Sequence, residues 1–368
     1  MNEPEGHSIL DAISYSQQSE ALRTFDPHSA VAELLEKLPA RERQVVQSRY
    51  GLLTGESQTL EVIGSALTLT RERIRQIEKD ALKKLRSLAA PPALAKGVDL
   101  IFQFIEERGN VARESEILSA LLISGDTPVM RQNLLFVLSL EPQFRLIKDS
   151  VAFHQSWALA GFDHELLERI AGQAAKILSA AGQPMSSEEL ISQMKTGLAD
   201  AQQEDLSNIA LESYISVSRT LSKNPYGEWG LAAWPQISPK DVGDKAYLIL
   251  SHHKQPEHYA KITEMINKQG FDRRTAHKES VHNELIKDKR FVLVGRGIYA
   301  LSEWGYNKGV VADIIRDVIA KAEKALSKEE IVSEVLKQRV VKRNTIIVGL
   351  SNKAKFQKNP ENKYLNVQ

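Results

Sequence analysis

The 368-residue chain contains no cysteine, which excludes a disulfide framework, a thiolate zinc site, an iron–sulfur cluster and a cysteine nucleophile. It also lacks a long apolar run. The nearest candidate, residues 117–123, is far shorter than the roughly 20 residues that cross a bilayer. No basic segment leads into an apolar one at the start of the chain, so a secretory signal is not expected. We therefore expect a soluble intracellular protein.

The composition is that of a globular protein with several domains. Apolar residues make up 42% and charged residues 26%, which is not a disordered composition. Single cores stop growing at roughly 250–300 residues, so this chain is too long for one ordinary core. We expect more than one folded domain.

The charges nearly cancel, with 48 Lys and Arg against 47 Asp and Glu, but they are segregated along the chain. Successive segments carry net charges of −5 (1–33), +4 (34–90), −4 (91–170), −2 (171–240), +2 (241–305) and +6 (306–368). Two basic zones separated by an acidic middle indicate different partners for different parts. The alternative is that Lys and Arg only solvate helix faces.

The first basic zone has the pattern of a helix-turn-helix. A helix over residues 39–50 is expected to end at Gly51. Thr59 is then an N-cap candidate for a helix over residues 60–67, and Thr70 is one for a helix from Arg71 to about Leu88. Two helices joined by a short turn, the second longer and basic, are typical of this motif.

The second of these helices presents one polar stripe, formed by Arg71, Glu72, Arg75, Gln76 and Lys79. Arg can bind guanine through O6 and N7, Gln can pair with adenine, and Glu can accept from N4 of cytosine. Farther along, Lys83, Lys84 and Arg86 are placed to meet phosphates, as is Lys79. The alternative is an exposed helix held by charge pairs along its own face, such as Glu72, Gln76 and Lys79.

The order of residues in this segment resembles region 4 of the bacterial sigma-70 family. The resemblance covers about residues 34–88 and rests on residues 38–43, 49–52, 59–64 and 70–86, including Thr70-Arg71-Glu72-Arg73-Ile74-Arg75-Gln76. It implies a cytoplasmic, nucleoid-associated bacterial protein that binds double-stranded DNA at the minus-35 promoter element. It also implies docking on the flap of the RNA polymerase β subunit. Carried to this chain, it implies that Arg71, Glu72, Arg75 and Gln76 read bases and that Arg73 contacts the backbone. The candidate DNA-binding residues are thus Thr59, Thr70, Arg71, Glu72, Arg73, Arg75, Gln76, Lys79 and Lys83.

A complete sigma factor also needs region 2, which melts the minus-10 element and grips the polymerase. Only a net acidic segment of about thirty residues precedes the resemblance in this sequence. We therefore expect that the chain does not initiate transcription as a conventional sigma factor.

Behind Pro91-Pro92, where we expect a domain boundary, a weak repeat recurs with a period near seventy residues. Each unit is expected to hold three helices and a small β-hairpin, which together make a winged helix. The first helices are expected at residues 100–107, 174–181, 246–253 and 314–322, and the third at 130–140, 211–222, 276–288 and 343–352. The hairpins are expected at residues 144–159, 226–231, 290–301 and 356–365, the sharpest being the one with the Gly295-Arg296-Gly297 turn.

The third unit, about residues 244–304, resembles the HARE-type winged helix of the bacterial RNA polymerase δ subunit and of some chromatin and restriction proteins. This resemblance rests on the architecture and on the ending Arg290-Phe291, then Gly297-Ile298-Tyr299-Ala300-Leu301-Ser302-Glu303-Trp304. Units one and two are acidic and are expected to dock proteins or act as spacers. Units three and four are basic and give a secondary set of candidate DNA contacts: Arg273, Arg274, Lys278, Arg296, Lys342 and Arg343. For these the alternative is charge that only aids solubility.

We find no pattern that predicts an active site. His252, His253, His258, His277 and His282 form the one histidine cluster, and their spacing fits no metal pair. We therefore predict no catalytic residue, no metal and no cofactor. An enzyme is the weakest interpretation.

The sequence predicts a mainly α, multidomain protein. The expected parts are a flexible acidic arm (1–30), a helix-turn-helix domain (31–90) and winged-helix-like units at 98–162, 165–238, 241–306 and 309–368. The expected function is sequence-specific transcription regulation at a minus-35-like element. The alternative is a recruitment scaffold of a restriction or anti-phage complex, in which the wings hold partner proteins.

Overall fold

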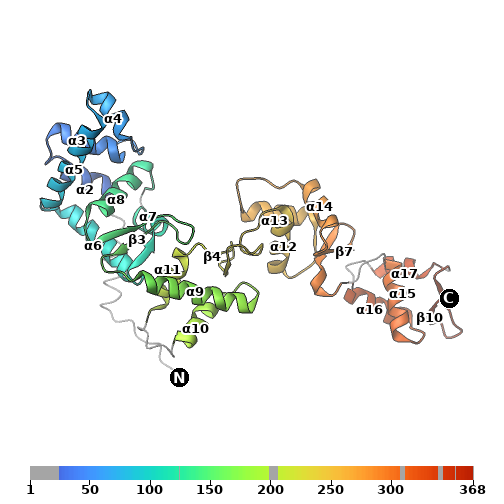
Figure 1. The fold of residues 1–368 in the computed structure, drawn as a ribbon. Helices are drawn as coiled ribbons and strands as arrows, with labels where there is room; N and C mark the ends of the chain where they lie inside the picture. Colours follow the sequence, from blue (N-terminus) through green and yellow to red (C-terminus); the bar gives the residue numbers. More distant parts are fainter. Residues whose placement is uncertain are drawn as a thin grey trace, which may run out of the picture. The chain divides into compact units, whose positions relative to one another are not determined.

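The computed structural model describes residues 25–123, 125–198, 206–306, 311–338, 343–352 and 354–367. The fold is mainly helical with small antiparallel sheets, as predicted (Figure 1). The chain divides into two compact units, residues 1–222 and 223–368, and each is described by itself.

The first unit begins with four helices: α2 (Pro27–Leu35), α3 (Ala40–Tyr50), α4 (Leu60–Leu67) and α5 (Arg71–Ser87). The acidic arm predicted for residues 1–30 lies mostly outside the described residues, and its last residues are helical. The carboxylate of Asp26 accepts hydrogen bonds from the amides of His28 and Ser29, and Pro27 occupies the first helical position. These two features start the first helix before Val31, where order was expected to begin.

The order helix, helix, helix, strand, strand then recurs four times, and we call the repeats modules 1 to 4. Module 1 contains α6 (Pro92–Glu106), α7 (Glu114–Leu121), α8 (Pro128–Leu140), β2 (Phe144–Ile147) and β3 (Ser156–Leu159), with β1 (Val111–Arg113) after its first helix. Module 2 contains α9 (His164–Ala181), α10 (Ser187–Leu198), α11 (Asn208–Val217), β4 (Leu221–Lys223) and β5 (Trp229–Leu231). The division between the two units falls within β4.

The second unit continues with modules 3 and 4. Module 3 contains α12 (Val242–His253), β6 (Glu257–His258), α13 (Tyr259–Gln269), α14 (Lys278–Lys287), β7 (Phe291–Gly295), β8 (Ile298–Leu301) and the short helix η1 (Ser302–Trp304). Module 4 contains α15 (Val311–Ala322), α16 (Lys328–Gln338), α17 (Arg343–Leu350), β9 (Phe356–Lys358) and β10 (Tyr364–Asn366). Modules 3 and 4 each have a separate hydrophobic cluster.

The hairpins predicted in modules 1, 3 and 4 are present, and two of them gain a third strand. The sheet orders are β1-β3-β2 in module 1 and β6-β8-β7 in module 3. The Gly295-Arg296-Gly297 turn closes the hairpin of module 3, with Gly297 at φ +70°. In module 2 the third helix was predicted to run to Ser222, but it ends at Val217, because Leu221 already belongs to β4.

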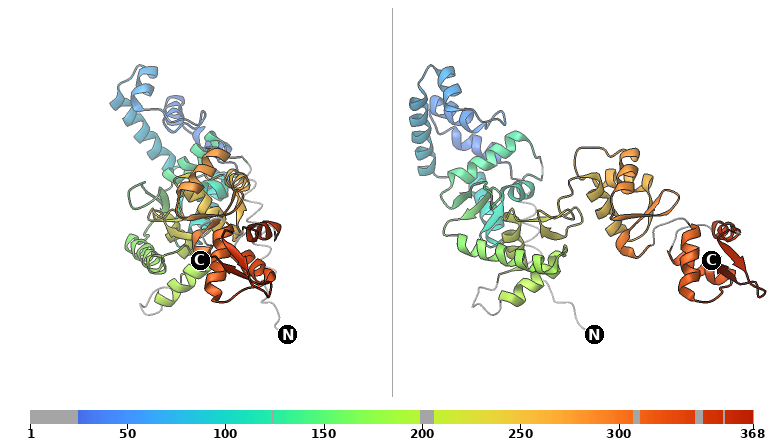
Figure 2. Two further views of the ribbon diagram at one scale, coloured as in Figure 1. Left: turned by 90° about the vertical axis from the view of Figure 1, so that its right-hand side faces the viewer. Right: turned by 45° about the vertical axis from the view of Figure 1, so that its right-hand side comes forward.

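Three of the front helices, α2, α3 and α5, share one hydrophobic core with module 1, although a boundary was expected at Pro91-Pro92. The shared core runs from Ala30 in α2 to Leu159 in β3. Figure 1 and both views of Figure 2 show α8 beside the front helices, and α8 contacts α2, α3 and α5. Pro92 occupies the first helical position of α6, so this pair of prolines starts a helix without separating two cores.

The contact between α8 and the front helices includes a buried polar group. The Asn133 side chain, 1% exposed, donates to the carbonyl oxygens of Leu52 and Val129, both at 2.8 Å. The rings of Tyr50 and Phe136 meet edge to face with centroids 4.9 Å apart. The guanidinium of Arg86 donates to the carbonyl oxygens of Leu140 at 3.0 Å and of Ser139 at 3.3 Å. These contacts fix the end of α5 against module 1.

Module 2 docks on module 1 through α11. Ser213 Oγ donates to the Val111 carbonyl oxygen at 2.5 Å, and the Tyr214 hydroxyl donates to that of Gly109 at 2.9 Å. A Cβ atom at Gly109, where φ is +73°, would lie 2.7 Å from the Tyr214 ring. Glycine is required here both for its backbone conformation and for this close approach.

Among the described residues, no single helix is long and apolar enough to cross a membrane. The pair α5 and α6 reaches the required length and composition only when taken together, and it is bent by 90° at its break.

The shared core gives a first prediction. We expect Phe136→Ala to lower the free energy of unfolding by about 3–5 kcal/mol, because it removes a fully buried ring and leaves a cavity. Urea denaturation followed by circular dichroism measures this change. Hydrogen exchange should show faster exchange in α3 as well as in α8.

The matched control is Leu146→Ala, which truncates a side chain that is 43% exposed on β2 of the same module. It should change stability by about 0.5 kcal/mol or less. If the α3 amides kept their protection in the Phe136→Ala protein, the shared core would be wrong.

Candidate nucleic-acid interface

The helix-turn-helix is formed by α4 and α5, and both predicted N-caps are present. Thr59 Oγ1 accepts from the amide of Val62 at 3.3 Å, and Thr70 Oγ1 accepts from that of Arg73 at 3.2 Å. In the turn, a Cβ atom at Gly64 would lie 2.7 Å from the Leu69 carbonyl oxygen. The absence of a side chain at Gly64 lets the turn fold closely against α4.

One side of α5 is buried and holds the helix in place. Ile74 and Ile77 join a cluster with Val45 of α3 and Ile63 of α4. Farther along, Ala81 and Leu85 enter the core that the front helices share with module 1. The helix is therefore fixed along its length by apolar contacts at spacings of three and four.

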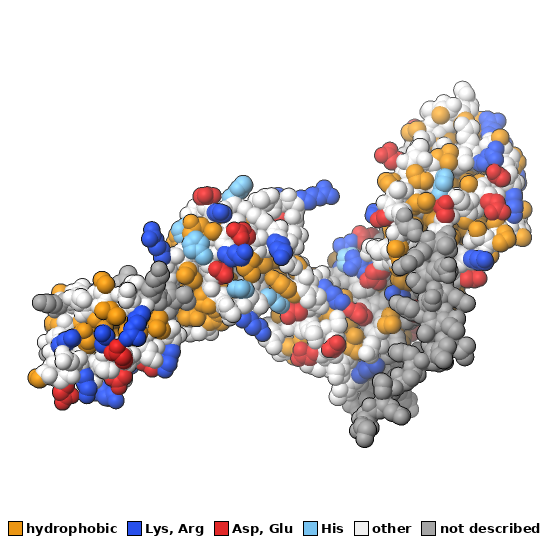
Figure 3. Space-filling view, turned by 180° about the vertical axis from the view of Figure 1, so that it is seen from behind, with side chains coloured by type: hydrophobic (Ala, Val, Ile, Leu, Met, Phe, Trp, Pro, Cys, Tyr) orange, Lys and Arg blue, Asp and Glu red, His pale blue; other side chains and the backbone are white. Residues whose placement is uncertain are grey.

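The other side of α5 is open. The residues predicted to contact DNA are all exposed, namely Thr59, Thr70, Arg71, Glu72, Arg73, Arg75, Gln76, Lys79 and Lys83. Figure 3, seen from behind, shows Lys and Arg side chains following the outer edge of the part formed by α3, α4 and α5. Those that share the open side of α5, namely Arg71, Glu72, Arg75, Gln76, Lys79 and Lys83, we call the α5 stripe.

Two hydrogen-bonded pairs order the α5 stripe. Arg75 donates to both carboxylate oxygens of Glu72, at 2.9 and 2.6 Å, and Arg73 donates to the Gln76 side-chain oxygen at 3.1 Å. The hydrogen bond from Arg75 lowers the pKa of Glu72, and the same bond raises the pKa of Arg75. Both side chains are well exposed, so water or a nucleobase can replace this pairing at little cost.

The alternative, in which charge pairs along its own face hold an exposed α5, applies in part. Glu72 does form such a pair, with Arg75. The farther cations also differ from expectation. Lys84 forms an ion pair with Glu42 at 2.5 Å, and Arg86 is held by carbonyl groups of module 1. The phosphate role predicted for Arg86 is therefore corrected to a structural one.

Contacts behind α5 were not found from the sequence. Arg49 Nε lies 3.5 Å from the Glu78 carboxylate, so α3 braces the middle of α5. Burial raises the pKa of the neighbouring Tyr50 to about 12, and the charge of Glu78 adds to the rise. No short motif marks these residues, because their partners are far apart in sequence.

The secondary candidates lie in the second unit. Arg273, Arg274, Lys278 and Arg296 are exposed. Arg343 is bound to the Glu329 carboxylate at 2.6 Å, and Lys342 lies outside the described residues. In the part of the chain that the structure describes, no three His, Asp or Glu residues are grouped as metal ligands.

Residues 34–87 match the family model for sigma-70, region 4. The chain is 42% identical over 92 residues to RNA polymerase sigma factor SigA4 of Synechococcus elongatus, covering 24% of this chain and 30% of that protein. It is 51% identical over 84 residues to sigma factor RpoD of Helicobacter pylori (23% of this chain, 12% of that protein). It is 56% identical over 84 residues to sigma factor SigA of a Nostoc species (23% of this chain, 19% of that protein).

The chain thus spans less than a third of the length of each of these relatives. The similarity identifies residues 34–87, which hold α3, α4 and α5, as a region 4 domain, which is a DNA-binding and non-enzymatic type of domain.

The geometry of the turn gives a second prediction. Thr70→Ala removes the side-chain acceptor at the start of α5 and should cost about 1 kcal/mol of stability. Chemical denaturation measures it. Ser65→Ala, on the exposed side of α4, is the control and should be nearly neutral. Equal effects of the two substitutions would show that the Thr70 cap contributes nothing.

Proposed function

We propose that this protein is a sequence-specific, DNA-binding transcription regulator whose region 4 domain reads a minus-35-like promoter element. The observation that supports this most is the α5 stripe. It presents the side-chain types that recognise bases on a helix whose opposite side is fixed by the core.

In this proposal the base-reading residues are Arg71, Glu72, Arg75 and Gln76. Arg75 leaves the Glu72 carboxylate and binds guanine, while Glu72 accepts from cytosine. Arg73, Lys79 and Lys83 contact phosphates of the DNA. Thr59 and Thr70, at the N-termini of α4 and α5, lie next to the same sugar-phosphate backbone. Before DNA binds, the ion pair between Glu72 and Arg75 holds these two side chains next to each other on the surface of α5.

We also propose that the region 4 domain contacts RNA polymerase at the flap of its β subunit, since the relatives are RNA polymerase sigma factors. Helix α8 covers parts of α2, α3 and α5. A polymerase contact therefore uses a surface of the region 4 domain that α8 leaves open.

We propose that modules 1 to 4 are winged-helix domains, with module 3 of the HARE type. Three helices and a strand pair recur in each. Modules 1 and 2 then serve as a spacer joined to the region 4 domain, because their docking surfaces are already used within the chain.

Selection of bound fragments from random DNA duplexes tests the main proposal. A motif should emerge, and Arg75→Ala should relax it at one base pair with a loss of about 1–3 kcal/mol in binding, because one bidentate contact is removed. The measurement is titration of the selected duplex and of its single-base variants.

The control is Lys176→Ala, which removes one exposed positive charge from α9 and should leave the motif unchanged. Selection that yields no motif contradicts promoter reading. Salt-independent binding of a partner protein without affinity for duplex DNA would favour a recruitment scaffold instead.

A further inference from the structure

The third helices of modules 1, 2 and 3 occupy the same register. Each ends four residues before the first strand of its hairpin: α8 at Leu140 before Phe144, α11 at Val217 before Leu221, and α14 at Lys287 before Phe291. Aligned in this way, three positions form one face of the helix. They are Asn133, Phe136 and Leu140 in module 1, Ala210, Ser213 and Val217 in module 2, and Ser280, Asn283 and Lys287 in module 3.

In modules 1 and 2 this face is an interface within the chain. Asn133 and Phe136 contact the region 4 domain and are each 1% exposed. Ser213 bonds to module 1, and Val217 accepts from the His154 amide at 2.9 Å. The face is buried in both modules, so neither can place it in a DNA groove.

In module 3 the same face is open. Ser280, Asn283 and Lys287 are all exposed, and no described residue of the second unit packs over them. The six side chains of modules 1 and 2 are buried, whereas the three of module 3 are exposed and include the charged Lys287. Polar, exposed side chains on a helix favour a wet, polar partner surface over an apolar one.

Cations surround this face at both ends. Arg273, Arg274 and Lys278 are exposed at the start of α14, Lys287 and Lys289 at its end, and Arg296 in the β7–β8 turn. None of the six forms an ion pair with another described residue of the second unit. Asp272 is paired with Lys245 at 2.6 Å and Asp288 with Arg290 at 2.6 Å, and two further carboxylates, Glu279 and Glu284, lie on α14 itself.

The packing of α14 sets the spacing of these cations. At the start of α14 Asn267 of α13 donates to the Ala276 carbonyl oxygen at 3.0 Å, and at the middle of the helix the Tyr259 ring stacks on His282 with centroids 4.3 Å apart. A Cβ atom at Gly297 would meet the His258 ring at 2.7 Å and the Tyr259 ring at 3.2 Å, so the β7–β8 turn lies beside the middle of α14. The ten-residue helix is about 15 Å long, comparable to the roughly 12 Å width of a major groove.

We propose that the open face of α14, with Arg273, Arg274, Lys278 and Arg296, is a second DNA-contacting surface that binds the duplex backbone without reading sequence. It adds to the affinity of the region 4 domain by raising its effective concentration on the same duplex. The proposal does not depend on promoter reading, since phosphate contact alone gives affinity for any duplex.

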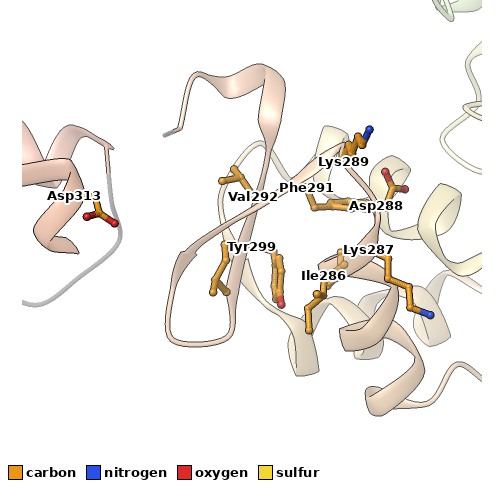
Figure 4. Close-up of a pocket in the computed structure, with 10 residues that line it drawn as sticks. Ile286, Lys287, Asp288, Lys289, Phe291, Val292, Tyr299 and Asp313 are labelled. Carbon is orange, nitrogen blue, oxygen red and sulfur yellow. The ribbon is translucent and has the colours of Figure 1, made fainter. Parts of the chain in front are cut away.

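A protein partner is the other outcome that the test must separate. An apolar hollow adjoins the end of α14, lined by Ile286 and Leu293, which are 63% and 47% exposed, and by Tyr299. Lys287 and Lys289 also line the hollow, and Figure 4 shows their side chains directed away from Tyr299.

The experiment compares two full-length variants on a duplex that lacks any selected motif. The test variant carries Arg273→Ala, Arg274→Ala, Lys278→Ala and Arg296→Ala. The control carries Lys96→Ala, Lys148→Ala, Lys176→Ala and Lys195→Ala, four exposed cations of modules 1 and 2, and has the same net charge. Affinity is measured by fluorescence anisotropy over a series of salt concentrations.

We expect the test variant to bind about tenfold or more weakly at physiological salt, with a log–log salt slope smaller by about 3–4, because four phosphate contacts are lost. The control variant should keep the affinity and the slope of the unaltered protein. The test variant should still prefer the selected motif over other duplexes, whereas Arg75→Ala should lose that preference. Failure of this proposal and failure of promoter reading are thereby distinguished.

A second pair of variants probes the centre of the face. Asn283→Glu places a carboxylate at the centre of the face and should weaken duplex binding at least as much as the loss of one phosphate contact. The control, Ser192→Glu on α10, should leave duplex binding unchanged. Equal salt slopes for the test and control variants would overturn the proposal. The proposal would also be overturned if the test variant bound duplex DNA as tightly as the unaltered protein does but no longer bound a protein partner.

Discussion

The structure depends on one contact, the packing of α8 against the region 4 domain. Without it, the front helices would be held to module 1 by the contact of α2 with α6 and by the chain between α5 and α6. With it, the two share a core in which Asn133 satisfies the Leu52 carbonyl and Phe136 meets Tyr50. A buried amide that must find its acceptor favours one docking geometry over others of similar apolar area. Helix α5 is thus held by module 1 as well as by its own domain.

The same helix position is used in two different ways along the chain. In modules 1 and 2 the third helix joins neighbouring parts of the chain, and its outward residues are buried. In module 3 the corresponding residues are exposed, and one of them is charged. The same helix position therefore builds the scaffold in two modules and offers a surface in a third.

Much of this fold could be predicted from the sequence, because its signals are local. The caps at Thr59 and Thr70, the helix end at Gly51 and the Gly297 turn are each set by a single residue type at a special backbone position. The strands β1 and β6 were missed, since two or three residues carry no periodicity. The shared core was missed because Pro91-Pro92 signals a break in the helix and says nothing of packing across it. For the candidate site, the exposure of the α5 stripe was predicted, but the pairing of Glu72 with Arg75 and the capture of Arg86 by module 1 depend on three-dimensional neighbours.

The junction of α5 and α6 has a geometric consequence. The two helices meet at 90°, and Arg86 ties the end of α5 to carbonyl groups of α8. If α5 lies in a groove, modules 1 and 2 must leave the double helix in one fixed direction about its axis. The direction of modules 1 and 2 about the DNA axis is then set by the position of the bound site. Two such molecules could lie on the same side of the duplex only when their sites are separated by whole helical turns of about 10.5 base pairs each.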